Sequence, residues 1–590
     1  MKKIFFFLIF SLVVLNAYSE MFMLNPYSRT HVQPLNGKWN AIVDLYCRGE
    51  VLGFYKNLKP VGKTDFIEYN FTSAFRLDVP GDFNSQLPEL KFYEGNVWYQ
   101  RTIKVDKSAD KRQFLYFAGA NYLTKVWLNG KELGLHEGGF LPFQFEITAL
   151  AQNGENDLVV MVNNNRKKDN IPALNFDWWN YGGITRDVFL VQTPATYICD
   201  YSIQLKKNSS TLISGYVTLN GNNPVQKFEV IIPELKINKS FNVINQGIAS
   251  FEIQAKPVLW SPQSPKLYDV IIVAGNDTVK EQIGFRTIEA KGNQLYLNGK
   301  SVFLKGINFH EEIPQRMGRA YSDADAAMIL NEVKALGCNF IRTAHYPQNE
   351  RIISMAEKMG LMIWSEIPVW QGIDFANDVV MKKAELMLKE MIYRDKNRAS
   401  VIIWSVANET SPSSERNKVL IGLTKVARAL DNSRLIGAAF DNIKYDKENT
   451  TFTLNDTLIN YLDLIGINKY MGWYMPFPVN PDKIKWNVAL SKPLIISEFG
   501  GEALYGQHGE SDVASSWSEE YQEKLFMDNL TMFQNIPNLC GTTPWVLFDF
   551  RSPFRLHYEN QTYWNRKGLL SDKGLRKKAW YVMQRYYKTK

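Results

Sequence analysis

The carboxyl-terminal half of the chain repeats one alternation, in which short apolar runs rich in Val, Ile and Leu are followed by longer amphipathic stretches. Such runs are typical of parallel strands buried on both faces, and the stretches between them are typical of helices. Eight strands in roughly 300 residues match the size of a (β/α)8 barrel. We therefore expect a catalytic TIM barrel over residues 288–590, with strands at 302–307, 340–343, 361–366, 401–405, 435–437, 464–468, 494–498 and 543–547.

The first half of the chain has a different period. Residues 20–195 alternate short β-like runs with turn signals such as Asn129-Gly130, which predicts a hairpin over residues 126–134. This pattern favours a jelly-roll β-sandwich. Residues 196–287 repeat it at the size of an immunoglobulin-like β-sandwich. The predicted architecture is therefore two β-sandwiches followed by a TIM barrel.

Residues 1–19 carry the features of a signal peptide. Lys2 and Lys3 precede an apolar run of about twelve residues, which is too short to span a bilayer, and a suitable cleavage site follows near Ser19. No later run reaches the roughly eighteen apolar residues that a membrane helix needs. We expect a periplasmic or secreted protein without a membrane anchor.

The net charge and the spacing of the cysteines limit which partners and cofactors we expect. The net charge is +8 over 590 residues, and no basic run stands out, so nucleic acid is not an expected partner. The cysteines have no CxxC spacing, so we expect no zinc site. No metal-ligand cluster is evident in the sequence, so no metal and no cofactor are expected in the reaction, and a bound Mg²⁺ or Na⁺ stays open. Cys338 and Cys540 lie in apolar runs, which predicts buried free thiols. The oligomeric state, a homo-oligomer included, stays open.

Polar side chains gather where the predicted barrel strands end. Glu409 and Glu498 come at the ends of two different strands. Because barrel enzymes hold their catalytic groups at the carboxyl ends of the strands, both should lie on one rim. Two such carboxylates are the minimum equipment for hydrolysing a glycosidic bond. Packing explains any one strand-end polar residue, but it does not explain so many of them together. Besides the two glutamates, the set contains Asn308, His310, Arg342, His345, Tyr346, Glu366, Asn408, Asn468, Tyr470, Tyr474 and Trp545, the last inside the predicted eighth strand.

Several motifs of the chain resemble glycoside hydrolase family 2, the family of β-galactosidases, β-glucuronidases and β-mannosidases. In the barrel half they are GINFH at 306–310, NFIRTAHYP at 339–347, WSVANE at 404–409 and ISEFG at 496–500. In the amino half, residues 98–99, 127–130 and 177–184 resemble the family's sugar-binding sandwich. The resemblance covers essentially the whole chain after residue 19 and implies the domain order given above.

The resemblance also implies residue roles. Glu409 would be the general acid/base and Glu498 the nucleophile of a retaining, two-step double displacement. Asn408 would donate to the sugar 2-hydroxyl, and Tyr470 would hydrogen-bond to the nucleophile. The other substrate-binding residues would be Asp177 from the amino-terminal domain, His345, Asn468, Tyr474 and Trp545.

One loop near the carboxyl terminus bears on the substrate. Asn565 and Lys567, followed by Gly568, match the Asn-x-Lys-Gly motif of family 2 β-glucuronidases. An ammonium and an amide N–H would bind the C6 carboxylate of a uronic acid. The chain departs from that group at Gln561, where β-glucuronidases commonly carry an arginine, and Arg551 or Arg555 is a candidate replacement. The alternative interpretation of the motif is a solvated basic loop.

These patterns favour an exo-acting retaining β-glucuronidase that cleaves a terminal β-linked uronic acid. A β-galactosidase or β-galacturonidase of the same family is the first alternative, and an inactive carbohydrate-binding protein is the second. A carbohydrate is the expected partner in each case.

Overall fold

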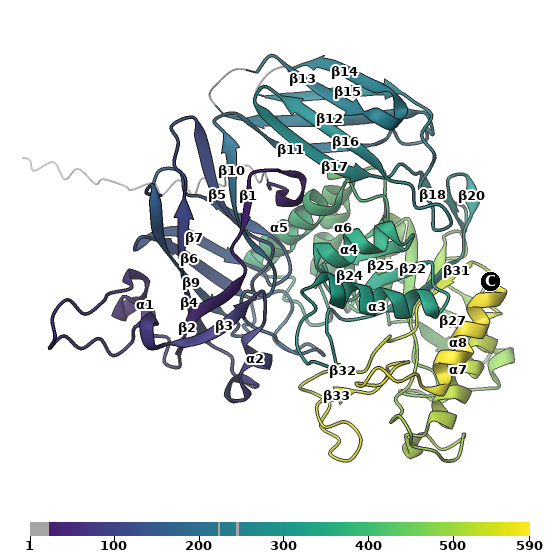
Figure 1. The fold of residues 1–590 in the computed structure, drawn as a ribbon. Helices are drawn as coiled ribbons and strands as arrows, with labels where there is room; N and C mark the ends of the chain where they lie inside the picture. Colours follow the sequence, from purple (N-terminus) through teal and green to yellow (C-terminus); the bar gives the residue numbers. More distant parts are fainter. Residues whose placement is uncertain (1–22, 222–224, 244–246) are drawn as a thin grey trace, which may run out of the picture.

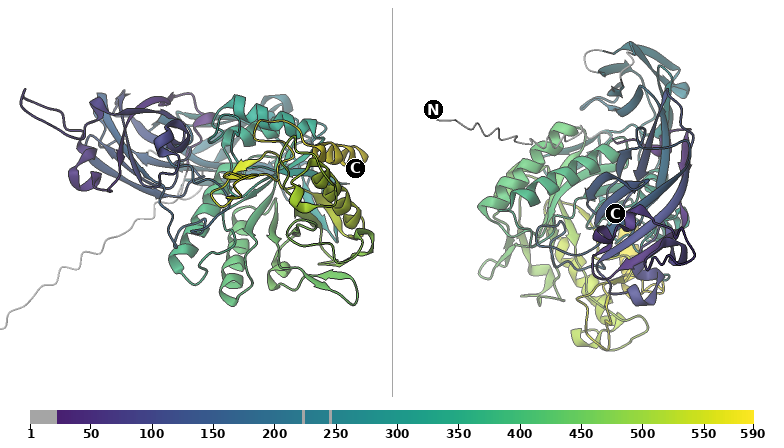
Figure 2. Two further views of the ribbon diagram at one scale, coloured as in Figure 1. Left: turned by 90° about the horizontal axis from the view of Figure 1, so that it is seen from below. Right: turned by 90° about the vertical axis from the view of Figure 1, so that its left-hand side faces the viewer.

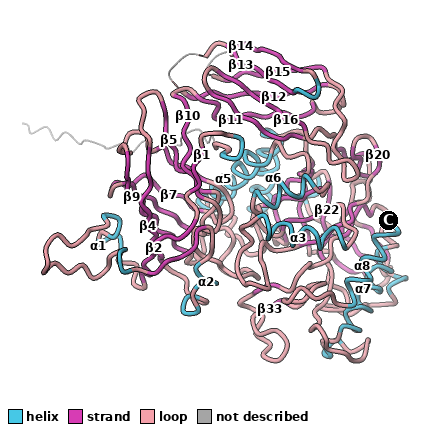
Figure 3. The backbone as a smooth tube through the Cα atoms, viewed as in Figure 1, coloured by secondary structure: helices cyan, strands magenta, loops and turns pink. Residues whose placement is uncertain are grey.

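The computed structural model describes residues 23–221, 225–243 and 247–590, so the predicted signal peptide lies outside the described residues. Figure 1 shows three units in chain order: a β-sandwich in purple, a second sandwich in teal, and a barrel in green to yellow. Figure 3 shows that strands dominate both sandwiches, whereas most helices gather around the barrel. Within the described residues, no helix is long and apolar enough to cross a membrane.

The first sandwich packs two antiparallel sheets, ordered β1-β10-β5-β8 and β3-β2-β4-β9-β6-β7. The predicted hairpin is confirmed as β6 (Leu123–Leu128) and β7 (Lys131–Glu137). Asn129 and Gly130 take φ values of 52° and 75°, as the favoured two-residue hairpin turn requires. The other elements are β1 (Val32–Pro34), β2 (Gly37–Asp44), α1 (Gly49–Leu52), β3 (Phe75–Val79), α2 (Phe83–Gln86), β4 (Asn96–Val105), β5 (Lys111–Phe117), β8 (Phe143–Glu146), β9 (Gly154–Asn163) and β10 (Val188–Pro194).

The second sandwich packs sheets ordered β11-β12-β15 and β14-β13-β16-β17. In β17 (Asp277–Ile283) every second side chain is buried, as expected where one face of a sheet meets the core. A small sheet of β18 (Ile288–Lys291), β19 (Gln294–Leu297) and β20 (Lys300–Ser301) follows. The remaining strands are β11 (Tyr197–Leu205), β12 (Leu212–Asn220), β13 (Lys227–Ile232), β14 (Ile237–Asn242), β15 (Ile248–Gln254) and β16 (Tyr268–Ala274).

The predicted TIM barrel is confirmed as a closed, parallel barrel. All eight residues of β24 (Val401–Asn408) are buried, as helices cover the outer face and side chains fill the interior. The other barrel strands are β21 (Leu304–Asn308), β22 (Phe340–Thr343), β23 (Met362–Glu366), β25 (Leu435–Phe440), β28 (Leu464–Asn468), β30 (Leu494–Glu498) and β31 (Leu539–Thr542). The helices around them are α3 (Asp323–Ala335), α4 (Glu350–Lys358), α5 (Asp378–Asp395), α6 (Ser414–Leu430), α7 (Glu519–Phe533) and α8 (Lys578–Thr589).

The eighth barrel strand was predicted at the wrong place. It is β31, and residues 543–547 follow it instead of forming it. Pro544 has no N–H to donate to a strand ladder, so the strand ends before it. Trp545, predicted inside this strand, therefore belongs to a loop on the carboxyl rim. The rim loops also carry β26 (Lys444–Asp446), β27 (Thr451–Thr453), β29 (Lys485–Asn487), β32 (Phe550–Arg551) and β33 (Trp564–Asn565).

Two smaller features complete the barrel, and the second of them, the buried thiols, confirms an expectation. Helix α3 starts with a capping box, in which Ser322 Oγ accepts from the Asp325 N–H and the Asp325 carboxylate accepts from the Ser322 N–H, both at 3.1 Å. Cys338 and Cys540 are buried free thiols.

A buried ion pair fastens the first sandwich to the barrel. Figure 2 shows that these two units lie against each other. Arg186, just before β10, donates to Glu311 at 2.7 Å and to the Pro347 carbonyl at 2.8 Å. Its side chain is 1% exposed and that of Glu311 is fully buried. This contact holds the sandwich loop 177–184 at the barrel rim.

The ion pair yields a stability prediction. Arg186→Met should destabilise the protein by about 3–5 kcal/mol, because the buried Glu311 would lose its closer cation and keep only Arg319, at 3.8 Å. Thermal unfolding followed by circular dichroism measures the loss. The control is Lys38→Met, which breaks an exposed pair with Asp78 on the same sandwich and should cost about 0–1 kcal/mol. Equal melting temperatures for the two variants would contradict this account.

Candidate active site

The carboxyl rim of the barrel and loop 177–184 of the first sandwich enclose a pocket of about 350 Å³. Nine of the eleven predicted site residues line it, all except Asn408 and Asn565. These nine are Asp177, His345, Glu409, Asn468, Tyr470, Tyr474, Glu498, Trp545 and Lys567, and six further residues complete the wall: Trp370, Gln371, Asp441, Lys469, Met475 and Arg555.

Glu409 directly follows β24 and is held by two amides. Its Oε1 accepts from Asn468 Nδ2 and its Oε2 from Gln371 Nε2, each at 2.9 Å. Its φ of 53° lies in the left-handed region, which costs a non-glycine residue roughly 1–3 kcal/mol. Burial, with the nearby carboxylates of Glu498 and Asp441, raises the pKa of Glu409 to about 8. Glu409 is therefore a carboxylic acid at neutral pH, as a proton donor must be.

Glu498, the last residue of β30, has a contrasting environment. Its Oε1 accepts from Arg342 Nη1 at 2.7 Å, and its Oε2 accepts from the Tyr470 hydroxyl at 2.6 Å. The side chain is nearly buried, yet it lines the pocket. Both oxygens are thus fixed by donors, one of them a cation, in the pocket that Glu409 also lines.

Arg342, on β22, organises the floor of the pocket. Its guanidinium also donates to Glu366 at 2.9 and 3.0 Å and to Asn408 Oδ1 at 2.7 Å. Burial alone would raise the pKa of Glu366, but Arg342 and His345 outweigh it and lower that pKa. Arg342 therefore has two roles: it pairs with the buried Glu366, and it fixes the Glu498 carboxylate.

The two asparagines differ in what they can offer a sugar. Asn408 Nδ2 is buried and has no hydrogen-bond partner among the described residues, so it can donate to a substrate hydroxyl. The Asn468 amide is already engaged: its Nδ2 donates to Glu409 and Asn408, and its Oδ1 accepts from Ser497. The geometry of Asn468 therefore favours the positioning of Glu409 over the direct sugar contact that we predicted.

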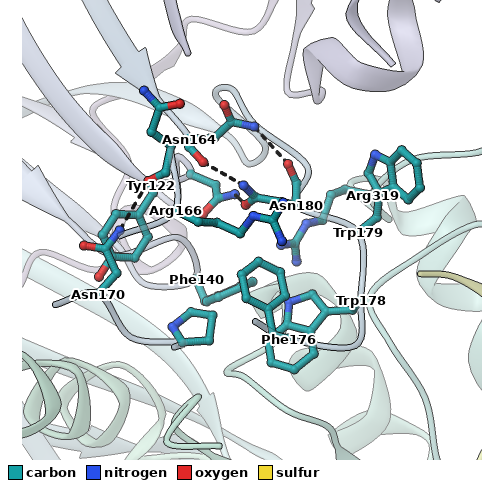
Figure 4. A pocket seen from close by; sticks show the side chains of 13 residues that line it. Tyr122, Phe140, Asn164, Arg166, Asn170, Phe176, Trp178, Trp179, Asn180 and Arg319 are labelled. Atoms are coloured by element: carbon teal, nitrogen blue, oxygen red, sulfur yellow. Dashed lines mark hydrogen bonds between the residues drawn. The ribbon is translucent and has the colours of Figure 1, made fainter. Parts of the chain in front are cut away.

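Aromatic rings form the wall around His345. His345 Nδ1 lies 2.9 Å from Glu366, and its ring stacks on Trp545 at 4.8 Å and 21°. Trp178, next to Asp177, lies 5.7 Å from the His345 ring. Figure 4 shows Trp178 packed with Phe140, Phe176 and Arg319 in a second, smaller pocket where the first sandwich meets the barrel. These contacts fix the loop that brings Asp177 to the active site.

Asp177 and Lys567 belong to a charged cluster at one end of the pocket. The Asp177 carboxylate accepts from Arg555 and from Ser552 Oγ. Lys567 Nζ donates to Glu502 at 2.9 Å and to the Tyr474 hydroxyl at 2.8 Å. Two cations thus face two carboxylates.

Two residues behind this cluster hold it in place. Asn565 is fully buried. Its Oδ1 accepts from the Lys567 backbone N–H at 3.2 Å, and its Nδ2 donates to Asp177 at 3.4 Å. It therefore supports the pocket wall without forming part of it. Gln561 donates to both oxygens of Glu502, at 3.1 and 2.9 Å. Burial alone would raise the pKa of Glu502, but Lys567 and Arg555 outweigh burial and lower that pKa. Gln561 therefore steadies the carboxylate that pairs with Lys567.

The sequence analysis missed several pocket residues. Asp441 directly follows β25, so the strand-end criterion that found Glu409 could have found it. Lys469 lies between two residues that we did select, Asn468 and Tyr470. Gln371 lies in a rim loop without regular structure, and so does Glu502, which binds Lys567 from behind the pocket wall; no pattern of spacing indicated either residue.

Comparison with protein families agrees with this geometry. Three models described as glycosyl hydrolases family 2 match in succession: the sugar binding domain at 63–194, the central family model at 186–286 and the TIM barrel domain at 288–552. The chain belongs to glycoside hydrolase family 2. It is therefore a glycoside hydrolase, and the predicted family and enzyme class are confirmed.

Individual relatives cover most of the chain. The chain is 27% identical to the β-glucuronidase of Rattus norvegicus, over 94% of its own length and 90% of the rat protein. It is 29% identical to a provisionally named β-glucuronidase of Formosa agariphila, over 83% of its own length but only 64% of that protein. The crystal structure of Ruminococcus gnavus β-glucuronidase matches with a TM-score of 0.84 and 26% identity, covering 97% of this chain and 100% of the other.

The placement of Asp177 predicts that the first sandwich contributes to turnover by this hydrolase. Asp177→Ala should lower kcat/KM by one to three orders of magnitude, at roughly 1.4 kcal/mol per tenfold, because a sugar hydroxyl would lose its acceptor and Arg555 its partner. Steady-state kinetics on an aryl glycoside measure the loss. Asp78→Ala, on the surface of the same sandwich, should keep full activity. Full activity in Asp177→Ala, or unfolding of that variant, would make this sandwich purely structural.

Proposed function

We propose that this hydrolase is an exo-acting, retaining β-glucuronidase. The observation that carries the proposal is that Lys567 and Arg555 line the same pocket as Glu409 and Glu498. A terminal uronic acid carries a C6 carboxylate, and ammonium and guanidinium N–H groups are strong, directional donors to it. The proposal is supported by a related Ruminococcus gnavus β-glucuronidase solved in complex with D-glucuronic acid, which is 26% identical with a TM-score of 0.82.

The proposed reaction uses the two carboxyl groups in turn. In the first step Glu498 attacks the anomeric carbon while Glu409 gives its proton to the glycosidic oxygen, and the sugar becomes covalently bound to Glu498. In the second step Glu409, now ionised, removes a proton from water, which attacks the anomeric carbon and releases the β-configured sugar. The free Nδ2 of Asn408 supplies the donor for the 2-hydroxyl.

The substrate carboxylate would meet a receptor that is already neutral. Glu502 offsets Lys567 and Asp177 offsets Arg555. Recognition therefore depends on N–H groups left over on the two cations. Gln561, which stands where β-glucuronidases commonly have an arginine, is bound to Glu502 and does not line the pocket. In our proposal Arg555 supplies the second cation. A neutral β-galactoside carries no C6 carboxylate to accept from these N–H groups, which disfavours that alternative.

Export is a separate part of the proposal. It rests on residues 1–19 alone, with their two lysines, apolar run and cleavage site. Expression of the full chain in a Gram-negative host, followed by fractionation and mass spectrometry of the purified enzyme, tests it. A mature protein that starts near residue 20 in the periplasm or medium is the expected result, and an unprocessed cytoplasmic protein would refute it.

The two carboxyl groups should respond differently to substitution. Glu498→Gln should abolish turnover, since no other group can form the glycosyl-enzyme. Glu409→Gln should slow substrates with poor leaving groups far more than activated aryl glycosides, because only the former need protonation. NMR of the first-formed product should show the β anomer. An α anomer would exclude retention, whatever the kinetics of the variants.

The pH dependence should follow the proton of Glu409. Its pKa of about 8 predicts that kcat/KM on a β-glucuronide with a poor leaving group falls above roughly pH 8, because the ionised form cannot protonate the leaving group. Asp441→Asn should move this alkaline limb to lower pH, since one of the carboxylates that raise the pKa is removed. A pH–rate profile of both enzymes provides the measurement. An unchanged limb in Asp441→Asn would show that it reports another group.

Lys567 should separate charged from neutral sugars. Lys567→Met should reduce kcat/KM on a β-glucuronide by roughly tenfold to a few hundredfold, as expected for a charge-assisted contact of about 1.5–3 kcal/mol. Slow activity on the matching β-glucoside should stay the same or improve. Lys573→Met, an exposed lysine nearby, is the control. Equal losses on both sugars would assign Lys567 to the fold, and a wild-type preference for β-galactoside would defeat the glucuronidase proposal.

A further inference from the structure

The pocket has a second charged end that the proposed chemistry does not use. The cluster of Asp177, Arg555 and Lys567 occupies the end assigned above to the uronic acid. Gln371, Asp441 and Lys469 line the pocket on the side of Glu409. Gln371 hydrogen-bonds to Glu409, and the Asp441 carboxylate is close enough to raise the pKa of Glu409. Since Glu409 gives its proton to the departing oxygen, the leaving group lies at this end.

Asp441 presents an open acceptor at this end. It directly follows β25 and is exposed. No other residue in the described part of the chain donates a hydrogen bond to its carboxylate, and no lysine, arginine or histidine there lies within ion-pair distance of it. Its oxygens are therefore available to donors of a bound molecule.

Lys469 presents unused donors beside it. This residue directly follows β28 and is only 6% exposed. Its ammonium contacts the Met475 sulfur at 3.2 Å and lies 5.2 Å from the Phe452 ring centre, but it has no carboxylate within 4.0 Å among the described residues. A thioether is a weak acceptor, so a nearly buried ammonium is left with most of its hydrogen-bonding capacity unspent. Because Lys469 lines the pocket, a bound molecule can supply the missing acceptors.

We propose that Asp441 and Lys469 form the binding site for the leaving group, and that this group is an uncharged, hydroxyl-rich sugar residue. A hydroxyl can donate to Asp441 and accept from Lys469, so vicinal hydroxyls satisfy both. An anionic group would be repelled by Asp441 and a cationic one by Lys469. An apolar group would cover both charges without replacing their water. The inference rests on the proposed function for the orientation of the substrate, and it makes the substrate a glucuronic acid-capped oligosaccharide.

Two substrates with the same uronic acid test the leaving-group site. They are β-D-glucuronosyl-(1→4)-D-glucose and 4-nitrophenyl β-D-glucuronide. Lys469→Met and Asp441→Asn should each lower the ratio of kcat/KM for the disaccharide over the aryl substrate by tenfold or more, and the double variant should lower it further. Lys444→Met, an exposed residue three positions after Asp441 and outside the pocket, should leave the ratio unchanged. Assays well below pH 8 keep Glu409 protonated in every enzyme.

A binding measurement separates recognition from chemistry. In the inactive Glu498→Gln background, calorimetry should show that the disaccharide binds more tightly than glucuronic acid alone, and that Lys469→Met removes this gain. Equal losses on both substrates, or an unchanged gain in Lys469→Met, would overturn the leaving-group site while the glucuronidase proposal stands. Wild-type enzyme that cleaves neither glucuronide would instead refute the glucuronidase proposal, and with it the assignment of the two ends.

Discussion

The positions of the side chains at the base of the pocket depend on one buried cation, Arg342. The Arg342 guanidinium has no exposed surface and donates to Glu498, Glu366, Asn408 and Asn308. A buried guanidinium is tolerable only where carboxylates and amides surround it, and the same bonds leave each partner one orientation. Arg342 thus fixes the proposed nucleophile and turns the Asn408 amide so that its Nδ2 remains free. A charge that is costly to bury therefore also preorganises the site.

The two carboxyl groups differ in environment because the Arg342 guanidinium contacts only one of them, Glu498. Glu498 lies against the cation, whereas Glu409 has only the neutral amides of Asn468 and Gln371 as partners and faces the charges of Glu498 and Asp441. Two chemically identical side chains in one pocket thereby have different environments, one that favours the protonated form and one that fixes both carboxylate oxygens. The proposed double displacement at neutral pH requires such a difference.

The sequence predicted what depends on short-range pattern and missed what depends on distant contacts. Apolar periodicity located seven barrel strands, and their ends located Glu409 and Glu498. The eighth strand was misplaced because the apolar residues after Pro544 resemble a strand, although Pro544 cannot join a ladder. The roles of Asn565 and Glu502 were beyond reach, since Asn565 contacts Asp177 across 388 positions of the chain. Only the folded chain brings such partners together.

Charge balance at the sugar end constrains how recognition can work. Lys567 and Arg555 are each neutralised before any substrate binds, by Glu502 and Asp177. A uronate therefore adds a negative charge to a neutral cluster, and attraction by net charge cannot select it. We therefore expect the uronate to be selected by the direction of the hydrogen-bond donors. Gln561 and the Arg566 N–H hold Glu502, and Glu502 in turn fixes Lys567, whose remaining N–H is available to the substrate. Glu502 thus orients Lys567 as Glu366 orients Arg342: in each pair a buried anion fixes the direction of a buried cation.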